Sequence, residues 1–229
     1  MKPFRNQILL ALSRADRSLL ARGLEHVTLE VGQSIEQANR PIEQVYFPDS
    51  GIISVVATWD NSQIGIGLIG REGMSATAVV LGDHRSPNEA CVLMAGGAHR
   101  ISAQRLRIAL ATSKTLRQRL QRYALAFMTQ IAQTAFANGK AGIEVRLARF
   151  LLMVRDRQDD DDLRLTHAVI AEMLGVRRSG VTDALNDLER KHLIGAKRSL
   201  ITSLNRKGLV ALAGGLYGVP ESEYDRLLC

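Results

Sequence analysis

Six polar side chains in the C-terminal third of the chain have types and spacing suited to reading a DNA duplex. They follow Gly175 closely and would share the outer face of a helix that begins near Arg177. Side chains of these types hydrogen-bond to base edges in the grooves and to backbone phosphates. The six are Arg177, Arg178, Ser179, Thr182, Asp183 and Asn186.

The elements that would position these side chains are two short helices joined by a tight turn across residues 165–191. Thr166 can cap the first helix, and Gly175 supplies the left-handed residue that ends it. Small Ala171 would let the helices cross closely, as in a helix-turn-helix. An ordinary helical hairpin is the alternative. The inward stripes are Ile170, Ala171 and Leu174 in the first helix, and Val181, Ala184, Leu185 and Leu188 in the second.

A β-hairpin and another helix are predicted to follow this unit. The run HLIGAKRSLITSL has two short β-prone segments around Lys197, Arg198 and Ser199, and Asn205 can cap a helix over residues 206–213. The hairpin would form a wing. Lys197 and Arg198 at its tip would contact phosphates beside the groove, which adds affinity but little sequence information.

The N-terminal half changes its pattern from helical to strand-like near residue 25. Short helices are expected over residues 6–24, with a break near residues 13–16. Up to residue 102, brief β-branched runs such as VYF, IISVVATW, IGIGLI and EACVLMA alternate with turn residues. Many short antiparallel strands at this spacing predict a small barrel or roll.

One long helix is predicted between the two halves, starting at the cap Ser113 and ending at Asn138-Gly139. The sequence NGKAG that follows is a candidate hinge between the halves. The helix carries a near-heptad stripe, which predicts pairing with a second copy of the chain unless the stripe is buried in its own domain. The stripe is Leu120, Ala124, Phe127, Ile131 and Thr134.

Composition sets bounds on the class of protein. The 229 residues are 46% hydrophobic and carry a formal net charge of +7, which suits one or two domains with real cores and favours polyanions as partners. Two cysteines, Cys91 and Cys229, are too few for a disulfide framework or a four-thiolate cluster. With no signal peptide or membrane span in the pattern, we expect a cytoplasmic protein that does not bind membranes, metals or a resident cofactor.

The stretch from residue 90 to residue 143 contains no Asp or Glu but carries basic side chains throughout. An anionic effector or an acidic partner, such as a polymerase subunit, could dock there. The alternative, which the modest cost of surface charge favours, is a solvated face balanced by acids elsewhere. The basic residues are Arg100, Arg105, Arg107, Lys114, Arg117, Arg119, Arg122 and Lys140.

Taken together, these motifs resemble the Crp/Fnr family of transcription regulators over nearly the whole chain. The resemblance is carried by VRLARFLL leading into LTHAVIAEMLGVRRSGVTDAL, and by VYFPDSGIISVV followed by IGREGM. It implies an α+β fold: a double-stranded, jelly-roll-like β-roll of the cyclic-nucleotide-binding type with N-terminal helices over residues 1–112, a dimerisation helix over residues 113–138, and a winged helix-turn-helix over residues 139–229. Double-stranded DNA is the implied partner, with RNA polymerase as a further one.

The resemblance also implies roles for individual residues. Arg178, Ser179 and Asp183 take the places where family members read bases, and Thr182 lies between them; Thr166 takes the place of a phosphate contact. Together with Arg177, Lys197 and Arg198 on phosphates, these residues would hold a homodimer on a palindromic operator. The base-reading residues differ from the glutamate and second arginine of the best-known member, so its operator is not expected here.

The effector side departs from the family pattern. Members that bind cyclic AMP hold its phosphate with an Arg-Ser pair, whereas this place carries Asn88-Glu89, and a glutamate repels a phosphate. Arg85-Ser86 would serve only if the loop shifted by about three residues. The effector is therefore left unidentified, and a regulator controlled by abundance or by protein partners is the alternative. An enzyme is disfavoured because no nucleophile elbow, paired metal ligands or GxxxxGK loop occurs.

Overall fold

The computed structural model describes residues 4–60, 62–159, 162–197, 200–203 and 205–228. Its N-terminal half begins with two short helices, α1 (Gln7–Leu10) and α2 (Arg14–Ala21). Each starts at a side-chain cap: Asn6 accepts from the Leu9 amide, and Ser13 accepts from the Asp16 amide. The predicted N-terminal helices are therefore confirmed, but the break lies at residues 11–13 and not at residues 13–16, because Ser13 already caps α2.

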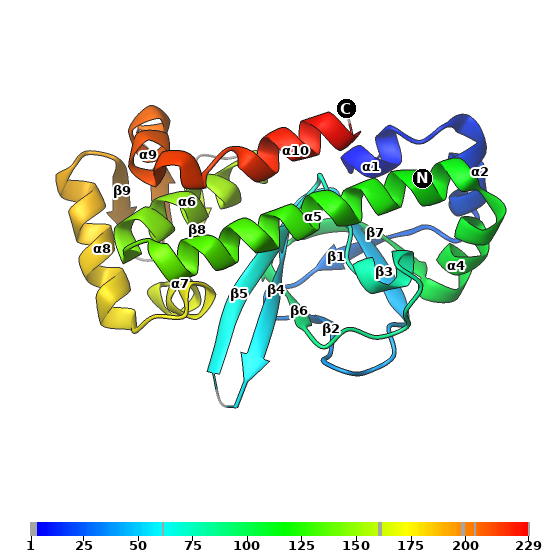
Figure 1. Cartoon of the computed structure of the whole chain (residues 1–229), viewed down its shortest axis with the longest axis horizontal. Coiled ribbons are helices and arrows are strands. Elements are labelled where there is room, and N and C mark those ends of the chain that lie inside the picture. Colours follow the sequence, from blue (N-terminus) through cyan, green and yellow to red (C-terminus); the bar gives the residue numbers. More distant parts are fainter. Residues whose placement is uncertain (1–3, 61, 160–161, 198–199, 204, 229) are drawn as a thin grey trace.

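Two antiparallel sheets form the β-roll that follows (Figure 1). One has the order β1 (Glu25–Leu29), β7 (Gly96–Ser102), β3 (Gln44–Pro48); the other has the order β2 (Ser34–Glu36), β6 (Glu89–Met94), β4 (Ile52–Trp59), β5 (Ser62–Ile69). Strand β2 was not predicted, because three residues with an irregular register against β6 leave too short a pattern. Two helices complete this half: α3 (Thr77–Val80) and α4 (Ala103–Thr112).

The roll is held together by aliphatic side chains that the two sheets enclose. Leu29, Phe47, Ile53 and Ile101 are at most 2% exposed. Each such side chain stabilises the fold by about 1.5–3 kcal/mol relative to an exposed one. The same cluster includes side chains of α5, so the long helix is part of the core of the roll.

Helix α5 (Lys114–Lys140) runs along the molecule and joins its two halves (Figure 1). Ser113 caps it as predicted, accepting from the Leu116 amide at 3.1 Å. The predicted end at Asn138-Gly139 is wrong. The amide of Ala141 still bonds to the carbonyl of Ala137 at 2.9 Å, because Gly139 keeps a helical conformation. The link to the next helix is therefore only residues 141–142.

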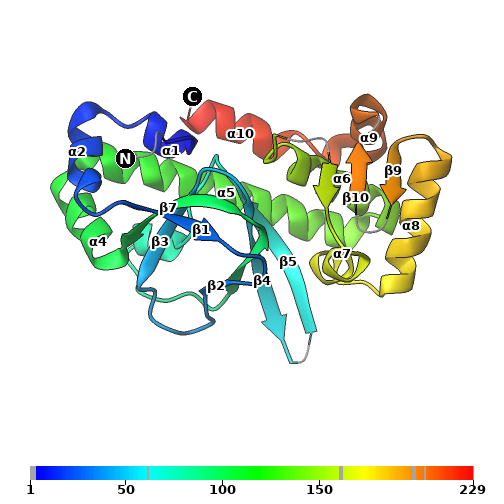
Figure 2. The same ribbon diagram turned by 180° about the vertical axis from the view of Figure 1, so that it is seen from behind.

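The C-terminal half contains a helical part and a small three-stranded sheet (Figure 2). Its helices are α6 (Ile143–Arg155), α7 (His167–Leu174), α8 (Arg178–Arg190) and α9 (Arg206–Ala213). The sheet has the order β8 (Asp162–Arg164), β10 (Leu200–Ser203), β9 (Ile194–Lys197). The predicted wing hairpin and the Asn205 cap are confirmed, whereas β8 adds a strand that the acidic run around it concealed.

A last helix, α10 (Val219–Leu228), leaves the C-terminal half and lies along α5 as far as α1 (Figures 1 and 2). Tyr224 and Leu228 pack against the core of the roll, and the Tyr224 ring meets that of Tyr123 edge-on. Arg119 of α5 donates to the Leu228 carbonyl at 2.7 Å. Helix α10 was not predicted from the sequence, because this segment carries polar side chains along most of its length.

Ion pairs also join the two halves. The Arg157 guanidinium at the end of α6 lies 2.7 Å from the carboxylate of Glu72, which follows β5. Asp159 binds both Arg5 and Arg71. Among the described residues, every helix is too short or too polar to span a lipid bilayer. The divisions at residues 112/113 and 138/139 stay predictions.

Candidate nucleic-acid interface

Helices α7 and α8 and the turn between them form a helix-turn-helix. The Thr166 hydroxyl accepts from the Val169 amide at 3.2 Å and so begins α7. Gly175 ends it with a φ of +60°, and the amide of Val176 returns to the Ala171 carbonyl at 3.0 Å. These contacts satisfy backbone groups at both ends of the helix. The motif prediction is therefore confirmed at the residues that carried it.

The two inward stripes are buried as predicted and fix how α8 is presented. Val181, Ala184, Leu185 and Leu188 are at most 2% exposed, and Ala171 is 7% exposed where the two helices meet. This packing belongs to a core that α6 and α9 share. Because the apolar face of α8 is fully occupied, its opposite face is held rigidly toward solvent.

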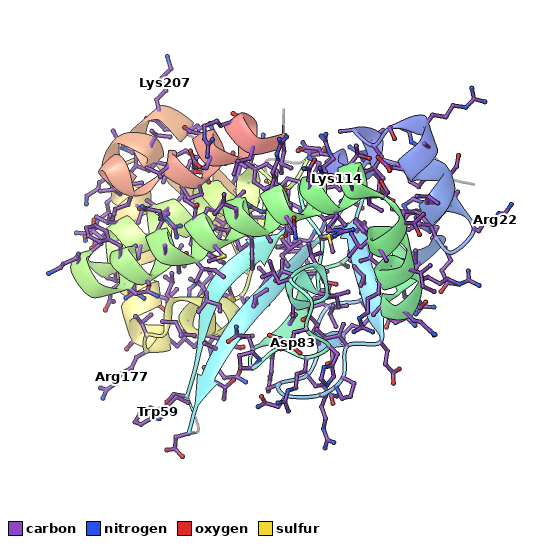
Figure 3. All side chains as sticks on the ribbon, turned by 45° about the vertical axis from the view of Figure 1, so that its right-hand side comes forward. Arg22, Trp59, Asp83, Lys114, Arg177 and Lys207 are labelled. Atoms are coloured by element: carbon purple, nitrogen blue, oxygen red, sulfur yellow. The ribbon has the colours of Figure 1, made fainter. Side chains whose placement is uncertain are left out.

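The exposed face of α8 carries most of the predicted DNA-contacting residues. Arg178, Ser179 and Asp183 are all exposed, and Arg177 precedes them and points away from the body of the protein (Figure 3). Within the part of the chain that the structure describes, neither arginine is in an ion pair. Two unpaired guanidinium groups at the start of an exposed helix form a cationic surface suited to a polyanion.

Thr182 differs from the other predicted base-reading residues. It is half-buried, and its hydroxyl lies 3.0 Å from His167 Nδ1 and donates to the Arg178 carbonyl at 3.2 Å. A hydroxyl held in this way is withdrawn from the outer face. The geometry assigns Thr182 to joining α8 to α7, a role that the helical spacing alone did not indicate.

Two of the predicted phosphate contacts, Thr166 and Lys197, are exposed in the structure. Thr166 is exposed at the start of α7, and Lys197 is exposed at the end of β9. The basic wing tip predicted from the sequence also includes Arg198, which lies outside the described residues. The Glu189 carboxylate of α8 accepts from the Ala196 amide of β9 at 2.8 Å and so joins the wing to α8.

The predicted dimer stripe of α5 lies mainly inside the chain. Leu120, Ala124 and Phe127 are at most 5% exposed and pack in the core of the roll, whereas Ile131 and Thr134 are half-buried. For Leu120, Ala124 and Phe127 the assignment to a dimer interface is therefore corrected, because α5 uses this part of its surface to cover the roll, as the alternative of a stripe buried in its own domain expects. For Ile131 and Thr134 the assignment stays a prediction.

A second apolar stripe on α5 faces solvent and was missed. Leu125, Met128 and Phe136 are 49%, 57% and 55% exposed. Together with Ala132 they recur at steps of three and four residues, as in the seam of a coiled coil. The sequence contained this signal, but both stripes have heptad-like spacing, and only the position of the roll shows which one is covered.

Side chains of α5 fill the space between the helix and the roll. The Gln130 amide accepts from the Leu68 amide at 2.7 Å and donates to the Leu68 carbonyl at 3.1 Å. The hydroxyl of Tyr123 donates to the Met74 carbonyl at 2.9 Å, and burial raises the pKa of this phenol. Phe127 lies against Gly67, where a Cβ atom would come within 2.6 Å of its ring.

The acid-free segment of the sequence does not form a single cationic surface. Arg100 pairs with Glu25 from the neighbouring strand. Arg105, Arg117 and Arg119 donate instead to backbone carbonyls, those of Arg22, Leu110 and Leu228. One acid and three backbone carbonyls therefore bind four of these eight cations, and the choice between a solvated face and a docking surface stays a prediction.

The fold and the site define a protein with an α+β architecture, an N-terminal β-roll, a long connecting helix and a C-terminal helix-turn-helix region. Residues 145–212 match the family model of the Crp-like helix-turn-helix domain. The chain therefore contains a Crp-like helix-turn-helix domain, as the sequence motifs implied. A search of curated proteins finds no match.

Solved structures of Crp/Fnr-type regulators share the fold over most of the chain. FixK2 from Bradyrhizobium japonicum is 16% identical with a TM-score of 0.69, and the match covers 84% of this chain and 98% of that one. A CRP-family transcriptional regulator from Thermus thermophilus is 18% identical with a TM-score of 0.66, covering 82% and 97%. The regulator CLP from Xanthomonas campestris, described as responsive to c-di-GMP, is 15% identical with a TM-score of 0.65, covering 83% and 99%.

Proposed function

We propose that this protein is a sequence-specific DNA-binding transcription regulator of the Crp/Fnr type. The observation that carries the proposal is the exposed Arg178, the first residue of α8, which has no ion-pair partner among the described residues and lies on a helix whose opposite face is buried in the core. A rigid helix with this outer face fits the major groove.

In this proposal Arg178 pairs in bidentate fashion with a guanine, a contact worth about 1–3 kcal/mol of discrimination against another base. Ser179 can hydrogen-bond to several bases, and the Asp183 carboxylate favours the amino group of cytosine. Thr182 contributes by holding α8 against α7 rather than by direct contact.

Phosphate contacts would orient the helix in the groove. Arg177 lies directly before α8, Thr166 lies at the start of α7, and Lys197 and Arg198 belong to the wing. Such contacts add affinity that falls with salt, because each neutralised phosphate releases counterions. They are not expected to distinguish one sequence from another.

The protein is proposed to act as a homodimer that pairs through the exposed stripe of α5. Leu125, Met128, Ala132 and Phe136 would meet their counterparts in a second copy across a two-fold axis. A two-fold protein matches a palindromic operator whose half-sites lie about one helical turn apart.

Control of DNA binding has two candidate forms. The connection through α5 and the short link at residues 141–142 would let an effector reposition the DNA-binding half. Tyr123, Phe127 and Gln130 fill the space between β5 and α5, which favours the alternative of a regulator with no ligand at that position. RNA polymerase remains an expected partner for which no surface is assigned.

Selection of bound sequences from random DNA, followed by affinity measurements on the selected operator and on unrelated DNA, tests the proposal. Arg178→Ala should lose about 1–3 kcal/mol on the operator and little on unrelated DNA. Lys197→Ala is the matched control and should weaken both about equally while lowering the salt dependence. Equal loss on all DNA for Arg178→Ala would refute its base-reading role, and failure to select any preferred sequence would refute the function.

A further inference from the structure

Arg149 of α6 is a buried cation that has no carboxylate partner among the residues that the structure describes. It is 5% exposed. Its Nε donates to the Leu216 carbonyl at 2.9 Å, and its Nη1 donates to the Thr134 hydroxyl at 3.1 Å. Its Nη2 is buried and has no hydrogen-bond partner among the described residues. Burial lowers the pKa of Arg149, with Arg157 acting in the same direction and the more distant Glu221 opposing both.

A second arginine lies one turn earlier on the same face of α6. Arg146 donates through Nη2 to the Leu174 carbonyl at the end of α7, but its Nε is buried and has no partner in the described part of the chain. Burial lowers the pKa of Arg146 as well. The carboxylate of Glu221 accepts from the Gly218 amide at 3.0 Å and is in no ion pair with either arginine.

Both arginines line one cavity, where α5, β5, α6 and α7 meet. Thr134 and Asn138 of α5 add a hydroxyl and an amide to its wall, and Gly67 and Met173 belong to its apolar part. The cavity volume is about 30 Å³, which is enough for a small ion at a mouth that is partly open to solvent. Gly65 lets α7 lie close to β5 at this cavity, because a Cβ there would overlap the Met173 side chain.

Two guanidinium groups in a partly enclosed site cost free energy unless an anion compensates their charge. Planar guanidinium donors match the oxygens of carboxylate and phosphate groups especially well. We propose that Arg146 and Arg149 bind a small oxyanion, either a free inorganic ion or the phosphate or carboxylate group of a metabolite, with Asn138 as a further donor.

This site would connect ligand binding to the position of the DNA-binding half. Its walls come from α5 and α6, on either side of the link at residues 141–142, and from β5 and α7, the first helix of the DNA-binding motif. An anion held between them would favour the arrangement seen here over any in which α7 leaves β5. This coupling, unlike the site itself, rests on the proposed function.

Calorimetry and thermal unfolding of the full chain with inorganic phosphate test the site without DNA. At constant ionic strength set with chloride, phosphate at a hundredfold excess over its Kd should raise the Tm of the wild type by about 5–10 °C. Succinate and glycerol 3-phosphate serve as parallel probes, and tighter binding than phosphate by one of them would identify a metabolite group rather than the free ion.

Variants decide whether Arg149 is responsible. Arg149→Met should abolish the phosphate-dependent Tm shift and should be at least as stable as the wild type without phosphate, because it removes a buried charge. Arg149→Lys keeps the charge but lacks the planar fork, so it should bind at least tenfold more weakly, and it serves if the methionine variant does not fold. Arg107→Gln, at an exposed position of α4, is the matched control and should respond as the wild type does.

The proposal is overturned if none of the three probes binds at 10 mM, or if Arg149→Met and Arg149→Lys bind as tightly as the wild type. It is also overturned if Arg149→Met changes only the oligomeric state, which would indicate that the guanidinium pairs with a second copy. DNA affinity measured with and without phosphate then tests the coupling. Binding of phosphate that leaves the DNA affinity of the wild type unchanged would refute the coupling alone, whereas loss of all DNA binding would bear only on the proposed function.

Discussion

Replacing Glu72 should destabilise the contact between the two halves of the protein more than removing any exposed ion pair. Its carboxylate accepts from Arg157 Nε at 2.7 Å, and the two side chains are 14% and 7% exposed. Burial lowers the pKa of Arg157, but the field of Glu72, helped by Glu221, outweighs burial, so the pKa is raised overall. Glu72→Leu leaves this guanidinium buried, with the Met153 carbonyl at 2.7 Å as its remaining hydrogen-bond partner among the described residues.

A buried charge that loses its partner typically costs about 3–5 kcal/mol. We therefore expect Glu72→Leu to lower the free energy of unfolding by about that amount in urea denaturation. The double variant Glu72→Leu/Arg157→Met should recover more than half of the loss, because it removes both charges. Glu25→Leu is the control: its pair with Arg100 is exposed, so it should cost at most about 1 kcal/mol. If Glu72→Leu costs no more than Glu25→Leu, the pair does not hold the halves together.

Three further predictions concern other elements. Phe136→Ser should shift the protein toward monomer in analytical ultracentrifugation without destabilising the fold. Phe127→Ala should instead lower the free energy of unfolding by about 3–5 kcal/mol and leave the oligomeric state unchanged. The reverse pattern would indicate that the buried stripe is the interface. Burial lowers the pKa of His99 in the folded protein, against the opposing effect of Asp49, so this histidine binds a proton more readily in the unfolded chain. The free energy of unfolding should therefore fall as the pH drops below about 6.5. His99→Gln should weaken that pH dependence when denaturation is measured at a series of pH values. Gly175→Ala should lower the free energy of unfolding by about 1–2 kcal/mol, because it places a Cβ at φ +60° and 2.7 Å from Ile64. Gly215→Ala, with open space around it, should leave the stability unchanged when both variants are compared by thermal unfolding.

Local sequence signals were enough to place the DNA-binding motif. Thr166 and Gly175 act through neighbours within four residues, and the stripe of α8 repeats every three or four positions, so helix ends and the buried face followed from the chain itself. The same holds for the Ser113 cap and for most strands of the roll. For the motif and the Ser113 cap the determining contact is close in sequence; for the strands only the residue pattern is local, since β1 and β3 both pair with the distant β7.

Features that depend on distant partners could not be derived in this way. Two heptad-like stripes compete on α5, and the covered one is decided by β5, more than fifty residues upstream. Thr182 looked like its neighbours until His167 of the other helix was placed beside it. The sequence also did not single out Arg149, because only the folded chain shows that its Nη2 is buried without a hydrogen-bond partner among the described residues.

The position of α10 determines the order in which parts of this protein can fold during synthesis. Tyr224 and Leu228 complete an apolar surface whose other members begin at α1, more than two hundred residues earlier. During translation, this apolar surface of the roll therefore stays exposed until residue 228 has been added. A bulky fusion placed directly after α10 would meet α1 at the same end of the molecule, so reporter tags belong at an exposed loop instead.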